Sequence, residues 1–129
     1  MLLKREIGTV HNANAMRILV VDDDPMTLKA VTKNLKKEGY EVRTASGGMA
    51  ALQIIENENL DLIITDIMMP ELSGLNLISF FREFYSVKVP IIIISSLENN
   101  NYPSLQEGAN DFLIKPINFV ELSSTVRKH

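Results

Sequence analysis

Residues suited to metal and phosphoryl chemistry follow four continuously apolar segments of this sequence. Three aspartates at 22–24 follow the first of these segments, Asp66 follows the second, Ser95 the third and Lys115 the fourth. A single polar residue in such a place is commonplace, because Asp and Ser often cap helices. Four of them in order indicate one shared site.

Carboxylates brought together in such a site would favour a small divalent cation. If Asp22, Asp23 and Asp66 meet, two of their charges about 4 Å apart repel by about 4 kcal/mol at an effective dielectric constant near 20. A bound cation relieves that repulsion. Oxygen ligands with no His or Cys nearby favour Mg²⁺ or Mn²⁺ over zinc.

Lys115 and Ser95 complete a set of groups that can handle a phosphoryl group. A metal ion, an ammonium and a hydroxyl together neutralise phosphoryl oxygens during in-line transfer. An aspartate can be the nucleophile, because its carboxylate forms an acyl phosphate. We expect Asp66 to have this role, since it follows a strand near the centre of the predicted sheet.

Short apolar segments bounded by Asp, Pro or Ser predict the strands that position these residues. Segments 18–21, 62–64, 91–94 and 112–114 are continuously apolar and rich in branched side chains. This pattern is typical of parallel strands covered on both faces. Segment 41–45 alternates instead, which favours an edge strand with one face near water.

Helical patterns separate the predicted strands, and Asp24-Pro25 and Asn118 are suitable starts for two of these helices. The expected inward residues are Leu28, Val31 and Leu35 before a stop at Gly39; Ala51, Ile54 and Ile55 within 49–58; Leu77, Ile78 and Phe81 within 75–85; and Phe119, Leu122 and Val126 within 119–128. Strand and helix thus alternate about five times, which predicts a doubly wound α/β domain with right-handed crossovers. Ligands bind such folds at the carboxyl ends of the strands.

Composition excludes several other kinds of protein. The chain has 129 residues, no cysteine and a formal net charge of −3. One domain is therefore expected, without disulfides, thiolate metal sites or a cysteine nucleophile. The acidic balance argues against nucleic acid binding, and no apolar run is long enough to span a membrane. The first residues lack a secretory apolar region, so we expect a cytoplasmic protein.

Residues 1–16 lack periodicity and are predicted to be a flexible extension or linker before a domain at 17–129.

Four motifs resemble those of the receiver domains of two-component response regulators, a chemotaxis-regulator-like superfamily. The motifs are ILVVDDDP at 18–25, DIMMP at 66–70 with a later Gly74, PIIIIS at 90–95 and GANDFLIKPI at 108–117. The likeness runs from about residue 17 to the end in family order. It implies a (βα)5 flavodoxin-like three-layer sandwich whose five-stranded parallel sheet has the order 2-1-3-4-5.

The resemblance also implies roles in phosphotransfer. Asp66 would accept a phosphoryl group from a phosphohistidine on a sensor histidine kinase or a phosphotransfer protein. Asp23 and Asp66 would hold Mg²⁺, with Asp22 acting directly or through water and the backbone carbonyl of Met68 as a further ligand. The domain would catalyse its own phosphorylation and slow dephosphorylation, without being an enzyme that turns over a separate substrate.

Further roles implied by the resemblance concern the response to phosphorylation. Lys115 would contact a phosphoryl oxygen, and its bond to Pro116 would be cis. Ser95 would move toward the phosphoryl group, and Phe112 would swing into the space that Ser95 vacates. One change of charge would thereby bias a two-state element.

The sequence departs from the family pattern in two places. Pro103 lies where the family has a full fourth helix, and Pro inside a helix costs about 3 kcal/mol. We therefore predict a fourth helix shortened to about 103–108. In the family, this helix and its neighbours form the usual output face. Met68 and Leu97 are apolar positions expected beside the phosphoryl group, and they cannot orient a hydrolytic water. A long-lived phosphoryl form is expected for this reason.

Three alternatives compete with the switch interpretation. A degenerate receiver acting as a phosphate-independent interaction module is one, although every acidic, hydroxyl and lysine position is present. A haloacid-dehalogenase-type phosphatase is another, since Asp22-x-Asp24 faintly resembles its nucleophile motif, but this leaves the motif at 66–70 unexplained. A flavodoxin relative would need a hydroxyl- and glycine-rich phosphate loop where this chain has three aspartates. An output domain beyond His129 and a homodimer are further expectations.

Overall fold

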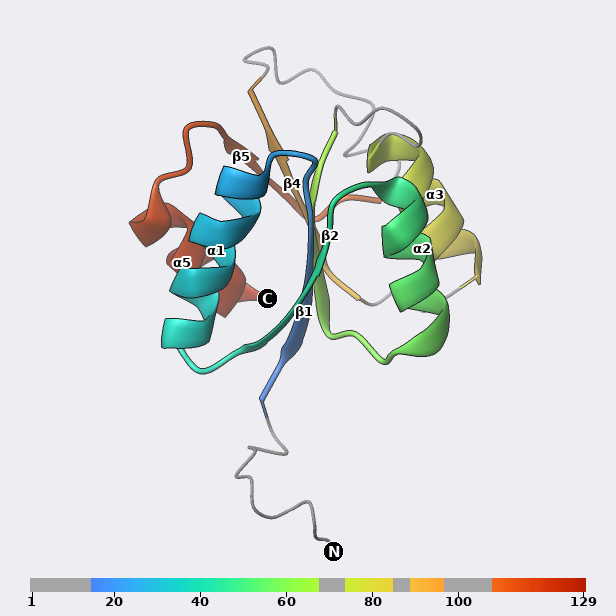
Figure 1. Ribbon diagram of the computed structural model, residues 1–129, viewed down its shortest axis with the longest axis horizontal. Coiled ribbons are helices and arrows are strands. Elements are labelled where there is room, and N and C mark those ends of the chain that lie inside the picture. Colours follow the sequence, from blue (N-terminus) through green and yellow to red (C-terminus); the bar gives the residue numbers. More distant parts are fainter. Residues whose placement is uncertain (1–14, 68–73, 85–88, 97–107) are drawn as a thin grey trace, which may run out of the picture.

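Five parallel strands form one sheet in the order β2-β1-β3-β4-β5 (Figure 1). The structure, a computed structural model, describes residues 15–67, 74–84, 89–96 and 108–129. The strands are β1 Arg17–Val21, β2 Glu41–Ala45, β3 Leu62–Asp66, β4 Ile91–Ser95 and β5 Asp111–Ile114, and the helices are α1 Pro25–Lys37, α2 Gly48–Asn57, α3 Gly74–Phe84 and α5 Phe119–Lys128. The predicted sheet order and doubly wound α/β fold are confirmed.

Helices cover both faces of the sheet, α1 and α5 on one side and α2 and α3 on the other (Figure 1). Each face has its own cluster of buried apolar side chains. Beneath α2 and α3 the cluster includes Leu19, Ala51, Ile55, Leu77, Ile78, Phe81 and Ile93. Beneath α1 and α5 it includes Ile18, Val31, Leu35, Ile64, Leu122 and Val126. The alternation of side chains along each strand supplies both clusters at once, which produces the predicted three layers.

Strand burial follows the sequence pattern at the centre of the sheet and departs from it at one edge. All residues of β3 and β4 are buried, as expected for continuously apolar strands with cover on both faces. The alternating strand β2 is an edge strand, as predicted. Full cover of 112–114 was also predicted and is wrong, because Ile114 is 36% exposed. The reason is that β5 is the other edge of the sheet, with a neighbouring strand on one side only.

Local signals set the ends of the helices that flank the site. Asp24 caps α1 and Pro25 occupies its first turn, where the missing N–H of proline is not needed. After α1, Gly39 has φ of 96°, a left-handed conformation that glycine adopts without a Cβ clash. Asn118 caps α5 by accepting a hydrogen bond from the Glu121 N–H at 3.0 Å.

One predicted inward residue of α5 is not buried. Leu122 and Val126 are fully buried as expected, whereas Phe119 is 37% exposed. Phe119 is the first residue of the helix, so its side chain lies at the rim of the layer rather than beneath it. Helical spacing alone therefore misplaced it.

Several predictions fall on residues outside the described ranges. These are the extension at 1–16 as far as residue 14, the shortened fourth helix at 103–108 as far as residue 107, and the positions of Met68 and Leu97. Met16 is described: its carbonyl accepts a hydrogen bond from the Glu41 N–H at 2.9 Å, and its side chain packs against the core. The domain boundary between residues 16 and 17 stays a prediction.

Arg82 of α3 joins the amino ends of β4 and β5, which no sequence pattern indicated. Its guanidinium donates to the carbonyls of Val89 and Gly108, each at 2.6 Å, and to Oδ1 of Asn110 at 3.0 Å. The same Oδ1 accepts from the Ile91 N–H at 2.9 Å. These bonds fix the start of β5, and with it the strand whose other end presents Lys115.

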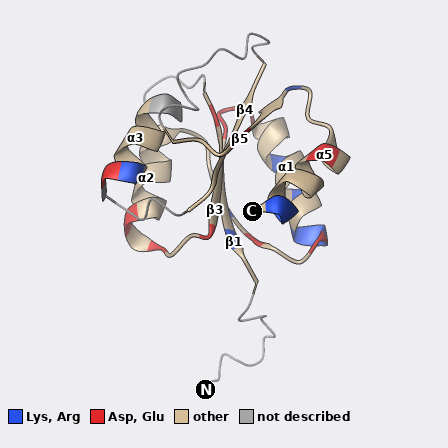
Figure 2. Ribbon diagram, turned by 180° about the vertical axis from the view of Figure 1, so that it is seen from behind, with Lys and Arg blue, Asp and Glu red and all other residues tan. Residues whose placement is uncertain are grey.

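Basic residues gather in the helical layer of α1 and α5 (Figure 2). Lys36 and Lys37 lie in the last turn of α1, and Arg127 and Lys128 in the last turn of α5, where positive charge complements the helix dipole. No helix in the described ranges combines the length and apolar character that crossing a bilayer requires. The absence of nucleic acid contact stays a prediction.

Candidate metal centre

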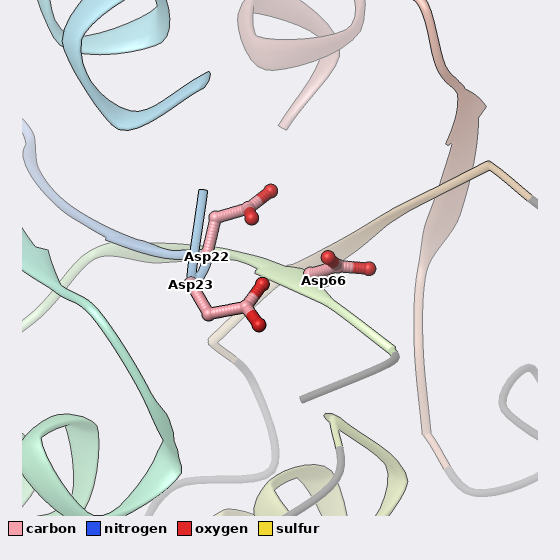
Figure 3. A group of neighbouring side chains, drawn as sticks. All are labelled: Asp22, Asp23 and Asp66. Atoms are coloured by element: carbon pink, nitrogen blue, oxygen red, sulfur yellow. The ribbon is translucent and has the colours of Figure 1, made fainter. Parts of the chain in front are cut away.

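Three carboxylates converge at the carboxyl ends of neighbouring strands. Asp22 and Asp23 follow β1, Asp66 ends β3, and these strands pair with Val21 opposite Thr65. One carboxylate oxygen from each aspartate lies within 4.8 Å of the others, and Figure 3 shows the three side chains next to one another at the ends of β1 and β3. Asp22 is fully buried, Asp66 is 5% exposed and Asp23 is open to solvent. The predicted cluster is therefore present and reachable from one side.

Lys115 lies against the two buried carboxylates. Its Nζ is 2.8 Å from Oδ2 of Asp22 and 3.2 Å from Oδ2 of Asp66. Burial opposes the charge of the ammonium, but its contacts with Asp22 and the charges of Asp22 and Asp66 outweigh this and hold the pKa of Lys115 above its usual value. Lys115 is therefore a cation throughout the neutral range.

Backbone hydrogen bonds place the residues of the cluster. The Lys115 N–H donates to the carbonyl of Ser95 at 2.8 Å, and the bond from Lys115 to Pro116 is cis, as the family resemblance implied. The N–H of Asp22 donates to the carbonyl of Ala45 at 3.1 Å, which ties the end of β1 to β2.

The charge and the donor atoms of this cluster fit a hard divalent cation. Three carboxylates and one ammonium leave two negative charges in a largely buried space. Oδ2 of Asp22 is buried and, although it faces Lys115 as an ion pair, makes no hydrogen bond. Carboxylate oxygens without a nearby imidazole or thiolate suit Mg²⁺ or Mn²⁺. Asp22, Asp23 and Asp66 would hold such an ion; the Met68 carbonyl lies outside the described residues.

Ser95 and Phe112 lie on the strands beyond Asp66. Ser95 is fully buried at the end of β4, one residue past Ile94, the strand partner of Asp66. Phe112 lies opposite Ile93 and packs, half-buried, against the core cluster beneath α2 and α3. Both predicted switch residues are thus near the site in the sheet, and their movement stays a prediction.

Two threonines beside the aspartates were not singled out from the sequence. Thr27 Oγ1 donates to Oδ2 of Asp24 at 2.8 Å, and this bond, followed by one from the Met26 N–H, lowers the pKa of Asp24. The spacing of Asp24 and Thr27, three residues apart at a helix start, is a capping signal that could have revealed the pair. Thr65 is buried and donates to the carbonyl of Asp66 at 3.0 Å, for which the sequence held no signal.

A groove of about 560 Å³ opens beside Lys115, between α1 and the start of α5. It is lined by Asp24, Met26, Thr27, Ala30, Val31, Ser96, Lys115, Pro116, Ile117 and Phe119. Met26 is 79% exposed and Phe119 is 37% exposed. An apolar surface therefore adjoins the polar site.

Replacing Asp23 by asparagine should stabilise the metal-free protein and weaken Mg²⁺ binding. The change removes one of three mutually repelling carboxylates together with one ligand charge. Thermal unfolding with and without Mg²⁺ measures both effects. We expect a higher midpoint without metal and at least about a tenfold loss of Mg²⁺ affinity, a loss seen even for outer-sphere partners of metals.

The exposed Glu56 on α2 offers a control for the same loss of charge, because it lies outside the carboxylate cluster. Glu56→Gln should leave Mg²⁺ affinity unchanged. A rise in metal-free stability that is equal for both variants would show that net charge, rather than the local cluster, governs the effect.

Known proteins resemble this chain along most of its length. The family model described as response regulator receiver domain matches residues 18–127. A probable transcriptional regulatory protein from Picosynechococcus is 37% identical over 120 residues, which are 86% of this chain and 47% of that protein. The chain spans about half the length, or less, of the curated relatives it matches.

Solved structures show the same likeness. A response regulator receiver protein from Pseudomonas putida has a TM-score of 0.84 and 30% identity, with 92% of this chain and 100% of that chain covered. The response regulator TrrA from Thermotoga maritima, crystallised in complex with Mg²⁺–BeF, has a TM-score of 0.81 and 36% identity, with 88% of this chain and 97% of that chain covered.

Proposed function

The chain belongs to the response regulator receiver domain family, and we propose that it is a signalling switch that accepts a phosphoryl group on Asp66 in a Mg²⁺-dependent in-line transfer. The observation that carries this proposal is the convergence of Asp22, Asp23 and Asp66 around Lys115. The Mg²⁺–BeF complex of the related TrrA supports the choice of metal.

Each residue of the site has a defined task in this proposal. A carboxylate oxygen of Asp66 attacks the phosphorus of a phosphohistidine; the new P–O bond forms as the P–N bond breaks, and the released imidazole takes up a proton. When bound by Asp22, Asp23 and Asp66, Mg²⁺ supplies charge that neutralises phosphoryl oxygens. Lys115 meets a further phosphoryl oxygen, and the Ser95 hydroxyl donates to another.

The same transfer converts the site into a conformational signal. A phosphoryl group on Asp66 competes for the ammonium that now pairs with Asp22 and Asp66. Ser95 moves toward the new group, Phe112 follows inward, and the surface around the fourth and fifth strand–helix units changes. Phe112 lies opposite Ile93 and is only half-buried, so an inward movement would bury more of its ring.

The partners follow from the chemistry of the donor and the shape beside the site. A sensor histidine kinase or phosphotransfer protein would present its phosphohistidine to Asp66 in the cytoplasm, with an apolar helix face against the groove that Met26 and Phe119 line. An output domain beyond His129, or a second copy of the chain, would read the altered surface.

Labelling with acetyl phosphate tests the proposal. With Mg²⁺ present, intact-mass measurement should show one phosphoryl adduct per chain, and peptide mapping should place it on Asp66. EDTA should prevent labelling, and added Mn²⁺ should restore it. Absence of any adduct at saturating Mg²⁺ would favour a degenerate receiver that works without phosphate, whereas release of phosphate from generic esters would favour a phosphatase.

A further inference from the structure

The third consecutive aspartate has a separate task from its two neighbours. Asp22 and Asp23 point into the carboxylate cluster, whereas Asp24 is not part of the group of side chains that could hold an ion among the described residues. Both carboxylate oxygens of Asp24 are engaged elsewhere: Oδ1 accepts from the Met26 N–H at 3.1 Å and Oδ2 from Thr27 Oγ1 at 2.8 Å. The side chain therefore belongs to the start of α1.

The backbone of the same residue touches the metal cluster directly. The Asp24 N–H donates to Oδ1 of Asp22 at 2.9 Å, and this bond turns Oδ2 of Asp22 toward Lys115, 2.8 Å away. Asp22 is fully buried, so its carboxylate has few other ways to be held. The orientation of this predicted ligand thus depends on the backbone of the turn at 22–24.

Among the described residues, the Asp24 side chain supplies two of the hydrogen bonds that hold this turn to α1. Pro25 has no N–H to contribute, and the first helical hydrogen bond to the turn is from the Leu28 N–H to the Asp24 carbonyl at 3.1 Å. Asp24 itself is extended, with φ of −91° and ψ of 112°, as N-cap residues are. The two side-chain bonds of Asp24 are what lock this conformation to the helix.

We propose that Asp24 is a positioning residue of the metal site: its carboxylate closes the first turn of α1 and thereby keeps its own N–H on Asp22, so the cap sets the affinity for Mg²⁺ without binding the ion. This inference rests on the proposed function only in taking Mg²⁺ as the ligand. Partners that orient metal ligands typically change affinity by about 10- to 100-fold when removed. We expect the lower end for Asp24, since it acts through one backbone bond.

Two variants separate the cap from the charge. Asp24→Asn keeps a capping oxygen and removes the negative charge, whereas Thr27→Val keeps the charge and removes one of the two capping bonds. Asp24→Ala removes the negative charge and both capping bonds. If capping governs the site, Mg²⁺ affinity should fall about tenfold in Asp24→Ala, less in Thr27→Val, and least in Asp24→Asn.

A Mg²⁺ titration followed by amide NMR signals measures these affinities, and acetyl phosphate labelling at low and saturating Mg²⁺ provides a second readout. At saturating Mg²⁺ the labelling rate of Asp24→Ala should return to near the wild-type rate, because only ion binding is impaired. Ile55→Val, a conservative change on the buried face of α2, controls for general loss of stability and should leave the affinity for Mg²⁺ unchanged.

Three results would overturn the proposal. If Asp24→Ala unfolds more easily but binds Mg²⁺ with the wild-type affinity, Asp24 is a helix cap that does not influence the metal site. Equal losses in Asp24→Asn and Asp24→Ala would assign the effect to charge. If Asp24→Ala fails to fold and Thr27→Val binds Mg²⁺ with unchanged affinity, the capping bond does not set the affinity of the site. A wild-type chain that neither binds Mg²⁺ nor becomes labelled would instead refute the proposed function.

Discussion

Replacing Asp66 by asparagine should reduce acetyl phosphate labelling by at least about 1,000-fold, as expected when the group that forms the new bond is lost. The amide has nearly the same shape as the carboxylate, so β3 and its pairing with β4 should persist. Neither Asp22 nor Asp23 can substitute, because both follow a different strand and Asp22 is fully buried against Lys115. Intact-mass kinetics at saturating Mg²⁺ measure the rate.

Asp61 provides a matched control for this substitution. It is exposed and lies just before β3, at the end opposite Asp66, where its Oδ2 accepts a hydrogen bond from the Arg17 N–H at 2.8 Å. Asp61→Asn removes the same charge from the same strand region and should be labelled at the wild-type rate. An adduct that forms on Asp66→Asn at that rate would mean that another residue is the phosphoacceptor.

The arrangement of the strands explains why so much of this site could be predicted from the sequence. Parallel strands bring their carboxyl ends to one edge, so a polar residue after each apolar segment is enough to place Asp22, Asp66, Ser95 and Lys115 near one another. The sheet is buried on both faces at its centre, which makes those segments conspicuous. Neither inference requires knowledge of side-chain geometry.

What could not be predicted depends on contacts between residues far apart in the chain. The bonds of Arg82 to Val89, Gly108 and Asn110 arise because α3 approaches the segments just before β4 and β5, and no spacing encodes that approach. The exposure of Ile114 and Phe119 depends on how far the helical layers extend over the sheet. Periodicity identifies the inward face of an element but not how well each end of that face is covered.

Lys115→Met should destabilise the metal-free protein by about 2–3 kcal/mol, a large effect for one substitution. Removing the ammonium leaves Asp22 fully buried and Asp66 5% exposed, each without its 2.8 Å or 3.2 Å partner. Breaking a buried pair costs about 3–5 kcal/mol, and we expect a loss at or just below the lower end of that range because the Lys115 side chain is 21% exposed. Denaturant unfolding with EDTA measures the change. Lys29→Met, an exposed site on α1, should stay within about 0.5 kcal/mol of the wild type.

Adding Asp22→Asn to Lys115→Met should recover part of the lost stability, because the double variant buries one uncompensated carboxylate, that of Asp66, instead of two. The pH dependence has a defined sign: the pKa of Lys115 is raised above 10.5 in the folded chain, so the stabilisation is complete below that pH and disappears as the pH rises further. Purely additive losses in the double variant would contradict the ion pair.

Magnesium should restore stability to Lys115→Met but should not restore its chemistry. A divalent ion held by Asp22, Asp23 and Asp66 replaces the missing positive charge in the ground state, and binding to the folded form alone raises its stability. It cannot occupy the place of the ammonium at the phosphoryl group, so labelling at saturating Mg²⁺ should remain about 100- to 1,000-fold slow. Wild-type labelling by this variant would leave Lys115 with a structural role only. The Lys115 ammonium thus contributes both to stability and to phosphoryl transfer. Bound Mg²⁺ can replace it in the first role but not in the second.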